Sequence, residues 1–292
     1  MAQQLADLPG KVKLEYFHQT ESSVQIPGRR PCPSCAPTKA VLEEIAGLSE
    51  QIELTVHEFS ESKELAAKYQ IERVPGILIR GEINRPVRII GMPGGVLMAL
   101  LVQTIRLCAG DPPDPPAKVK STLKKLRKKT HLRVVGSMMD PATGDAALLT
   151  TALALLSNKL EVTVYNLDEF PDLGVQLGLD HVPATVVGDR HGFAGVASIE
   201  ELVRFLYDLE AHPDRASLQP PQVADGSARP WAPPQPPPPP GQGPPGPPGP
   251  GRRGPGRRGP GPRGGGRRGG GPQDGTPPGM RRTESGLVVP NR

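Results

Sequence analysis

Two cysteines separated by two residues are the side chains of this sequence that are best placed to do chemistry. They are Cys32 and Cys35, with Pro33 and Ser34 between them. At this spacing the second thiol can reach back to a mixed disulfide formed by the first and resolve it. The reaction requires a thiolate, and a helix that begins at the pair would stabilise that anion through its unpaired N–H groups and its dipole.

The main alternative for the pair is one half of a metal site. A structural zinc ion takes four ligands, usually with a second pair of Cys or His, and the six histidines of the chain are scattered rather than paired at ligand spacing. The pattern therefore favours redox chemistry, with no metal and no cofactor beyond the Cys32–Cys35 disulfide. A non-catalytic remnant of a redox site is a further alternative. The third cysteine, Cys108, lies in an apolar helical pattern and is expected to pack in a core.

Hydrophobic patterns around the cysteines predict an α/β unit with a mixed sheet. A strand precedes the pair, and a helix runs from the pair to Gly47. Val74-Pro75 opens a later strand, about forty residues after the cysteines. The predicted elements are strands at Val12–Phe17, Ile52–Phe59, Val74–Ile79 and Val87–Ile90, and further helices at Glu64–Tyr69 and Val96–Leu107.

The same pattern occurs a second time without its cysteines. A shift of 108 residues superposes Glu53–His57 on Glu161–Tyr165, and Pro75 on Pro183. This shift also puts Asp140 and Thr143 at the positions of the two cysteines. Asp140 is a good N-cap for the helix that follows. We expect Pro183 to be a relic of the fold that shapes a strand edge, and a substrate groove is the alternative.

Two changes in composition predict the domain boundaries. Residues 111–117 are rich in proline and cannot continue a helix, so they are expected to link a first unit at 1–110 to a second at 118–212. Lys118–Lys129 is predicted to be a basic helix with a solvated face. Residues 213–292 are rich in Pro, Gly and Arg, and we expect them to form a disordered tail.

The net positive charge of the chain resides in this tail. Its twelve Arg and four acidic residues give +8, and since the whole chain is +5, residues 1–212 carry −3. The folded part therefore need not bind nucleic acid. The tail either keeps the protein soluble or binds a polyanion weakly through its paired arginines, although Trp231 is its single aromatic residue for stacking on bases.

The cysteine pair, the Val-Pro dipeptide and the duplication together resemble the tandem thioredoxin-fold protein disulfide oxidoreductases, also called glutaredoxin-like domain proteins. The two-unit N-terminal domain of the flavoprotein that reduces bacterial peroxiredoxin is similar. The resemblance covers residues 11–210 and implies two tandem thioredoxin-fold units with central mixed sheets. The chain departs from the pattern at Pro31, where thioredoxins have an aromatic residue, and in an extended loop before Cys32.

The resemblance implies roles for five residues. Cys32 would be the nucleophile and Cys35 the resolving thiol. Pro75 would be a cis-proline facing the disulfide, and the backbone of Val74 would bind an extended substrate segment. Glu15 lies in the first strand, where thioredoxins carry a buried carboxylate that moves protons for the second cysteine. An ordinary surface glutamate is the alternative reading of Glu15.

These inferences predict a cytoplasmic thiol-disulfide oxidoreductase in which only the first unit is active. It would reduce or exchange disulfides of substrate proteins, with a peroxiredoxin as one candidate, and receive electrons from a thioredoxin-reductase-like enzyme. No membrane partner is expected, because Met1–Val12 lacks the features of a secretory signal and no run of 18 apolar residues occurs. The alternative is a redox-sensing or docking protein that the tail tethers to nucleic acid or another polyanion.

Overall fold

The structure is a computed structural model that describes residues 2–20, 31–188, 191–212, 280–282 and 288–290. It divides into two compact units, Met1–Pro237 and Pro238–Arg292, and each is described by itself. Most of the extended loop before Cys32 and most of the tail that was predicted to be disordered lie outside the described residues. None of the described helices is long and apolar enough to span a membrane.

The first half of the larger unit follows the predicted order of elements. The elements of this half are β1 (Val12–His18), α2 (Cys35–Gly47), β2 (Ile52–Glu58), α3 (Lys63–Lys68), β3 (Gly76–Gly81), β4 (Val87–Ile90) and α4 (Gly95–Cys108). A short helix that was not predicted, α1 (Ala2–Ala6), precedes this half and packs against α4, the last helix of the half.

The second half repeats this order. β6 begins at Leu160, 108 residues after the start of β2 at Ile52, and the peptide bonds before Pro75 and Pro183, also 108 residues apart, are both cis. The duplication inferred from the sequence is therefore present in the fold. The elements are α5 (Ala117–Leu123), β5 (Thr130–Gly136), α6 (Pro141–Leu156), β6 (Leu160–Asn166), α7 (Pro171–Leu177), β7 (Ala184–Val187), β8 (His191–Ala194) and α8 (Ile199–Ala211).

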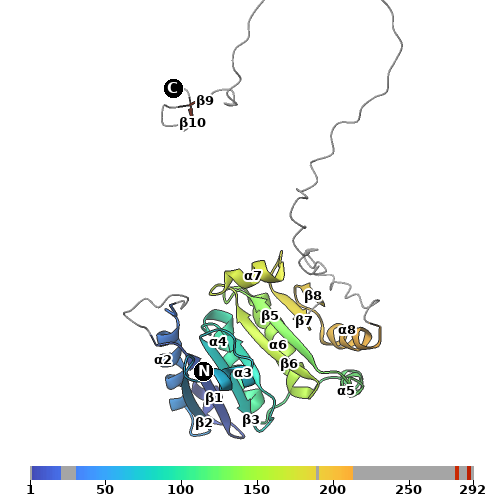
Figure 1. Ribbon diagram of the computed structural model, residues 1–292. Helices are drawn as coiled ribbons and strands as arrows, with labels where there is room; N and C mark the ends of the chain where they lie inside the picture. The colour runs from blue at the N-terminus through green and yellow to red at the C-terminus, as the bar shows by residue number, and fades with distance from the viewer. Residues whose placement is uncertain (1, 21–30, 189–190, 213–279, 283–287, 291–292) are drawn as a thin grey trace, which may run out of the picture. The chain divides into compact units, whose positions relative to one another are not determined.

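Both halves contribute to one mixed sheet. Its eight strands pair in the order β2-β1-β3-β4-β6-β5-β7-β8 (Figure 1). The halves are joined by parallel pairing of β4 with β6. β3 and β7 run against the other six strands. The ends of β1 and β5 and the starts of β3 and β7 therefore meet along one side of the sheet, which we call the carboxyl edge.

The main core lies between the sheet and the helices α2, α4, α6 and α8. Strand side chains alternate between faces, so Leu14 and Tyr16 of β1 point into this core, together with Leu42 of α2 and Leu101 of α4. Burial of each large apolar side chain stabilises the fold by about 1.5–3 kcal/mol. On the opposite face, the short helices α3 and α7 pack over a second cluster that includes Phe17.

The basic segment after the linker is a shorter helix than predicted. α5 ends at Leu123, and after a turn at residues 124–125 the segment up to Lys129 has no regular secondary structure. The carboxylate of Glu210 in α8 accepts hydrogen bonds from the backbone N–H groups of Arg127 and Lys128. These bonds satisfy backbone donors outside a helix, and burial of Leu126 fixes the turn against the core.

The smaller unit contains one described element pair. β9 (Met280–Arg282) pairs antiparallel with β10 (Val288–Pro290). The composition of the tail gave no signal for these two short strands. A pair of this size is marginally stable by itself in water.

Candidate active site

Cys32 and Cys35 form a disulfide at the start of α2, with an S–S distance of 2.02 Å. The Cys35 N–H donates to the Cys32 carbonyl over 3.1 Å, and the Thr38 N–H donates to the Ser34 carbonyl over 3.0 Å. This turn places the pair where the first N–H groups of the helix lack intrahelical partners, which favours an anion. Cys32 is 6% exposed and Cys35 is 2% exposed, so Cys32 is the more exposed residue of the pair.

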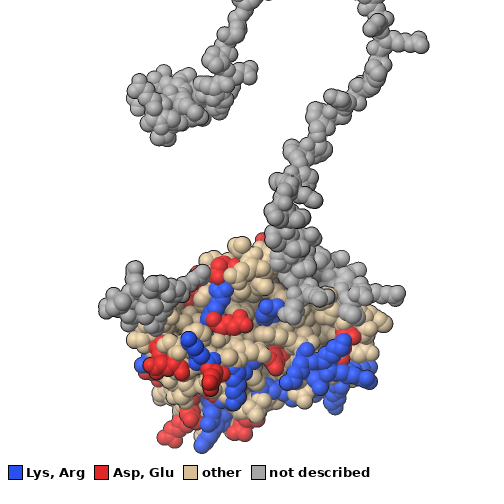
Figure 2. All heavy atoms as spheres, in the orientation of Figure 1, with Lys and Arg blue, Asp and Glu red and all other residues tan. Residues whose placement is uncertain are grey.

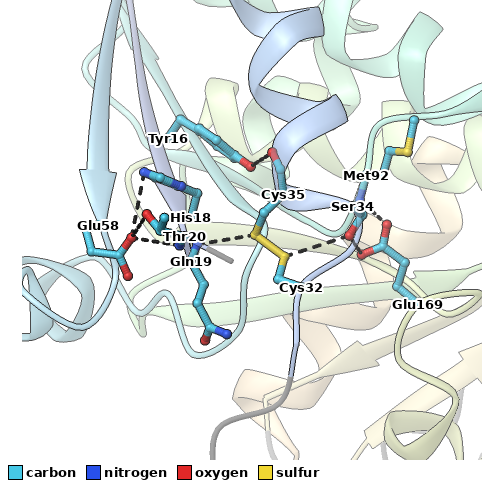
Figure 3. Close-up of a disulfide and its surroundings, with 10 residues drawn as sticks. All are labelled: Tyr16, His18, Gln19, Thr20, Cys32, Ser34, Cys35, Glu58, Met92 and Glu169. Carbon is cyan, nitrogen blue, oxygen red and sulfur yellow. Dashed lines mark hydrogen bonds and ion pairs between the residues drawn. A yellow bond between two sulfur atoms is a disulfide. The ribbon is translucent and has the colours of Figure 1, made fainter. Parts of the chain in front are cut away.

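The end of β1 holds Cys35 through two contacts (Figure 3). The Tyr16 hydroxyl donates to the Cys35 carbonyl over 2.7 Å, and the Gln19 N–H donates to the Cys35 Sγ over 3.3 Å. Burial raises the pKa of the Tyr16 hydroxyl, and the negative charge of Glu169 acts in the same direction. Tyr16 therefore remains a neutral donor at physiological pH, and Cys35 is fixed while Cys32 is left nearer the surface.

A carboxylate from the second half reaches this site. The Ser34 hydroxyl donates to Glu169 Oε2 over 2.9 Å, and the Met92 N–H donates to Glu169 Oε1 over 2.9 Å (Figure 3). The Ser34 Oγ lies 3.9 Å from the Cys32 Sγ. Glu169 follows β6, so the half that lacks cysteines places a negative charge one hydroxyl group away from the Cys32 sulfur.

A second cluster of polar side chains lies beside Cys35. The N–H and hydroxyl of Thr20 both donate to Glu58 Oε2, and the Ser60 hydroxyl donates to Glu58 Oε1. Burial alone would raise the pKa of Glu58, but these hydrogen bonds and the nearby His18 together lower it. The carboxylate at the end of β2 thus holds the chain at Thr20, directly after the residue that contacts Cys35.

The structure places Val74 and Pro75 at the carboxyl edge, where the disulfide lies. Gly76, the next residue, pairs with Phe17 at the end of β1. The Pro75 carbonyl accepts from the Gly91 N–H, and Val74 is half-buried. Among the described residues, no backbone-to-backbone hydrogen bond to Val74 is present outside the regular helices and strands, which is the condition for pairing with a substrate strand.

The second half also holds the residue before Val74. Arg73 Nη1 donates to both carboxylate oxygens of Asp172 in α7, over 3.0 and 2.9 Å. Arg73 Nη2 donates to Gln176, and the guanidinium lies over the Phe170 ring at 5.2 Å. A hydrogen bond between two charged groups is stronger than one between neutral groups, and here a single nitrogen of the guanidinium serves both carboxylate oxygens. Asp172 and Glu169 thus join the second half to two different parts of the site.

Glu15 points away from the cysteines. Neighbouring strand residues face opposite sides of the sheet, and Tyr16 is the one that contacts Cys35. Glu15 instead forms an ion pair with Arg80. Its carboxylate also lies 3.5 Å from the His57 ring, whose pKa burial lowers. The structure therefore does not bring Glu15 to the disulfide, because the strand register assigns it to the other face.

The equivalent place in the second half holds a hydrogen bond instead of a disulfide. The Thr143 hydroxyl donates to Asp140 Oδ2 over 3.1 Å, and Asp140 Oδ1 accepts from the Ala142 N–H. The predicted N-cap role of Asp140 is confirmed. A side chain at Gly136, which ends β5, would come within 2.2 Å of the Thr143 hydroxyl. The second half therefore keeps the helix start without redox chemistry.

The remaining cysteine is a core residue. Cys108, at the end of α4, is fully buried, and burial raises the pKa of its thiol to about 12. It is thus a neutral thiol with no access to a substrate. Among the described residues, no group of three or more His, Cys, Asp or Glu is arranged to hold a metal ion.

Comparisons with known proteins agree with this architecture. Residues 22–85 match the family model described as a thioredoxin domain. A search of curated protein sequences found no match. The matched residues lie within the first half, which carries the cysteine pair at its helix start.

Two solved structures illustrate the similarity of fold. One is the NTD_N/C domain of the alkylhydroperoxide reductase AhpF from Enterococcus faecalis, at 19% identity and a TM-score of 0.62, covering 70% of this chain and 97% of that one. The other is a protein disulfide oxidoreductase from Aeropyrum pernix, at 20% identity and a TM-score of 0.61, covering 74% and 92%. The resemblance to this class that was stated from the sequence is confirmed at the level of fold.

Sequence reasoning missed Glu169, Asp172 and Tyr16. Tyr16 could have been found, because it lies in the predicted first strand, next to Glu15 and on the opposite face of the sheet. Glu169 and Asp172 carry no local signal. They reach the site only because β4 pairs with β6 and brings the loop after β6 beside the first half.

Proposed function

We propose that this protein is a thiol-disulfide oxidoreductase that reduces or exchanges disulfides of other proteins through Cys32 and Cys35. The observation that carries the proposal is the disulfide at the start of α2, at the same edge of the sheet as the Val74-Pro75 segment. The fold similarity to a protein disulfide oxidoreductase supports it. In this proposal Cys32 is the nucleophile and Cys35 is the resolving thiol.

The proposed reaction begins with the reduced pair. The Cys32 thiolate attacks one sulfur of the substrate disulfide, forms a mixed disulfide and releases the other substrate sulfur as a thiolate, which takes up a proton. The Cys35 thiolate then attacks the Cys32 sulfur, restores the Cys32–Cys35 bond and releases the reduced substrate. Two electrons pass from the cysteine pair to the substrate.

The residues around the pair fit these steps. The helix start stabilises the Cys32 thiolate, whereas the negative charge of Glu169 destabilises it. The Glu169 carboxylate can also accept the proton of the Cys32 thiol through the Ser34 hydroxyl. Within the described residues the Val74 backbone makes no backbone hydrogen bond, so it can pair with an extended substrate segment, and Asp172 holds Arg73 beside it. The balance between the helix and Glu169 sets how much thiolate is present at neutral pH.

The partners belong to the same proposal. Substrates are proteins with accessible disulfides, with a peroxiredoxin as one candidate, and the electron donor is a thioredoxin-reductase-like enzyme. The fold similarity to a domain of an alkylhydroperoxide reductase supports this direction. We place the reaction in the cytoplasm, where such a pair would be kept reduced. Polyanion binding by the tail involves residues outside the described ranges.

The test is reduction of insulin disulfides with dithiothreitol as the electron source. We expect turnover by the unmodified chain, loss of turnover in Cys32→Ser, and a trapped mixed disulfide in Cys35→Ser. Cys108→Ser is the matched control, since a buried neutral thiol should not contribute. Equal activity of Cys32→Ser and the unmodified chain would rule out the proposal.

A further inference from the structure

The strongest local charge in the described part of the chain lies far from the disulfide. Between Lys118 and Lys129 there are seven basic residues and no acidic residue. Residues 1–212 carry a net charge of −3, so without these seven basic residues they would carry −10. The basic patch is defined by Lys118, Lys120, Lys124, Lys125, Arg127, Lys128 and Lys129, all of which are exposed.

Few side-chain contacts within the described residues neutralise this charge, although the Glu210 carboxylate binds the backbone of the segment. Lys120 forms an ion pair with Asp114, and Lys125 lies over the Tyr207 ring at 5.9 Å. No ion pair to the other five side chains is present in the ranges that the structure describes. Figure 2 shows the Lys and Arg side chains gathered over α5. The patch is therefore available to an external anionic group.

A groove with apolar walls adjoins the patch. It lies between α5 and α8 and has a volume of about 240 Å³. Tyr207, which is 39% exposed, supplies accessible apolar surface, whereas Val119 and Val203 also line the groove but are almost fully buried. Lys118, Lys125 and Arg204 stand at its rim, with Glu200 and Glu201 at the start of α8.

The surface is held in a fixed shape. The Glu210 carboxylate binds the N–H groups of Arg127 and Lys128 over 2.8–3.0 Å, which ties the basic segment to α8. Val119, Leu123 and Leu126 are buried beneath it. A partner would therefore not bear the cost of ordering this segment.

The patch lies at the opposite side of the sheet from the disulfide. It immediately precedes the start of β5, and β5 runs parallel to β1 through the pairings with β6, β4 and β3. The disulfide lies after the end of β1, at the carboxyl edge. A protein bound at the patch would leave the carboxyl edge open.

We propose that the groove between α5 and α8, together with the basic patch, binds an acidic peptide segment of a partner protein that carries an apolar anchor residue. Carboxylates of the segment would pair with the basic side chains, and the anchor would occupy the groove against Tyr207. The chemistry favours a protein over a nucleic acid, because the groove offers apolar depth rather than a row of aromatic surfaces for stacking.

The test uses the full chain and a fluorescent peptide of about 15 residues with about five glutamates around a central phenylalanine. We expect binding that weakens about tenfold in K118E/K125E and about tenfold between roughly 50 and 200 mM salt. Tyr207→Ala, or replacement of the peptide phenylalanine by alanine, should weaken binding about threefold or more. The charge-matched control K11E/K63E changes two exposed lysines elsewhere and should bind like the unmodified chain.

Two results would overturn the proposal. One is equal binding by K118E/K125E and K11E/K63E, which would place the peptide elsewhere, such as on the tail. The other is an oligonucleotide of matched charge that binds at the patch more tightly than the peptide and ignores Tyr207→Ala. Neither result bears on the Cys32–Cys35 reaction, so this proposal and the proposed function fail separately.

Discussion

The two halves of the folded unit start the same helix in two different ways. α2 begins at a disulfide between Cys32 and Cys35, and α6 begins at a hydrogen bond between Asp140 and Thr143. Both arrangements close one turn at the carboxyl edge, but only the first can exchange electrons. A helix start therefore survives the loss of its cysteines when a capping side chain replaces them.

The half without cysteines contributes side chains to the candidate site. It supplies Glu169 to Ser34 and Met92, and Asp172 to Arg73. The first half contributes the reacting atoms, and the second half fixes the charge and the backbone around them. Four predictions sharpen this comparison, from the largest expected effect to the smallest.

Glu169→Gln removes the charge that the second half places near Cys32. Loss of a nearby negative charge favours the thiolate, so alkylation of reduced Cys32 at about pH 6 should become roughly tenfold faster. The Ser34 hydroxyl also becomes a better donor to the sulfur. Glu61→Gln is the control, because Glu61 is the exposed residue 108 positions earlier. An unchanged alkylation rate would show that Glu169 has no electrostatic role.

Asp172→Asn weakens the hold of the second half on the substrate segment. Loss of this charged pair should let Arg73 and the adjoining Val74 move, raising KM for a protein disulfide about fivefold with little change in kcat. Reduction of a small disulfide such as cystine should be unaffected. Asp168→Asn, which releases Ser137 and Met138 at the other helix start, serves as the control. A fall in kcat with unchanged KM would contradict the positioning role.

Asp140→Ala and Ser34→Ala compare the two N-caps directly. Asp140 caps α6 through its side chain, whereas Ser34 makes no side-chain cap bond to α2. The first substitution should therefore destabilise the protein by about 1 kcal/mol without loss of activity. The second should cost less stability but change Cys32 reactivity, since it breaks the contact with Glu169. Urea unfolding and insulin reduction measure the two effects, and the reverse pattern would disprove the comparison.

Cys108 should give the smallest effect in the native state. Its raised pKa, about 12, means that the folded protein holds the thiol proton more tightly than the unfolded chain does. Stability from this group is therefore present below about pH 9 and falls as the pH rises from there towards 12. Native protein at pH 8 should show no labelling of Cys108 by a thiol reagent, with labelling appearing in denaturant. Cys108→Ala should reduce the loss of stability above pH 9.

Local patterns were enough for much of this protein. The spacing of Cys32 and Cys35 indicated the redox pair, and one offset of 108 residues indicated the second unit and the matching prolines, which are both cis in the structure. The N-cap at Asp140 followed from its residue type and position. These features depend on short-range geometry, which the order of residues fixes directly.

Other features depended on how distant segments pair. The register of β1 turned Glu15 towards Arg80 and gave the contact with Cys35 to Tyr16, a difference of one residue that hydrophobic alternation alone does not resolve around a buried strand. Glu169 and Asp172 entered the site through the pairing of β4 with β6. The sequence by itself determined the two units and the reacting sulfurs, whereas only the tertiary structure decided which charges surround them, because those charges come from the other half of the shared sheet.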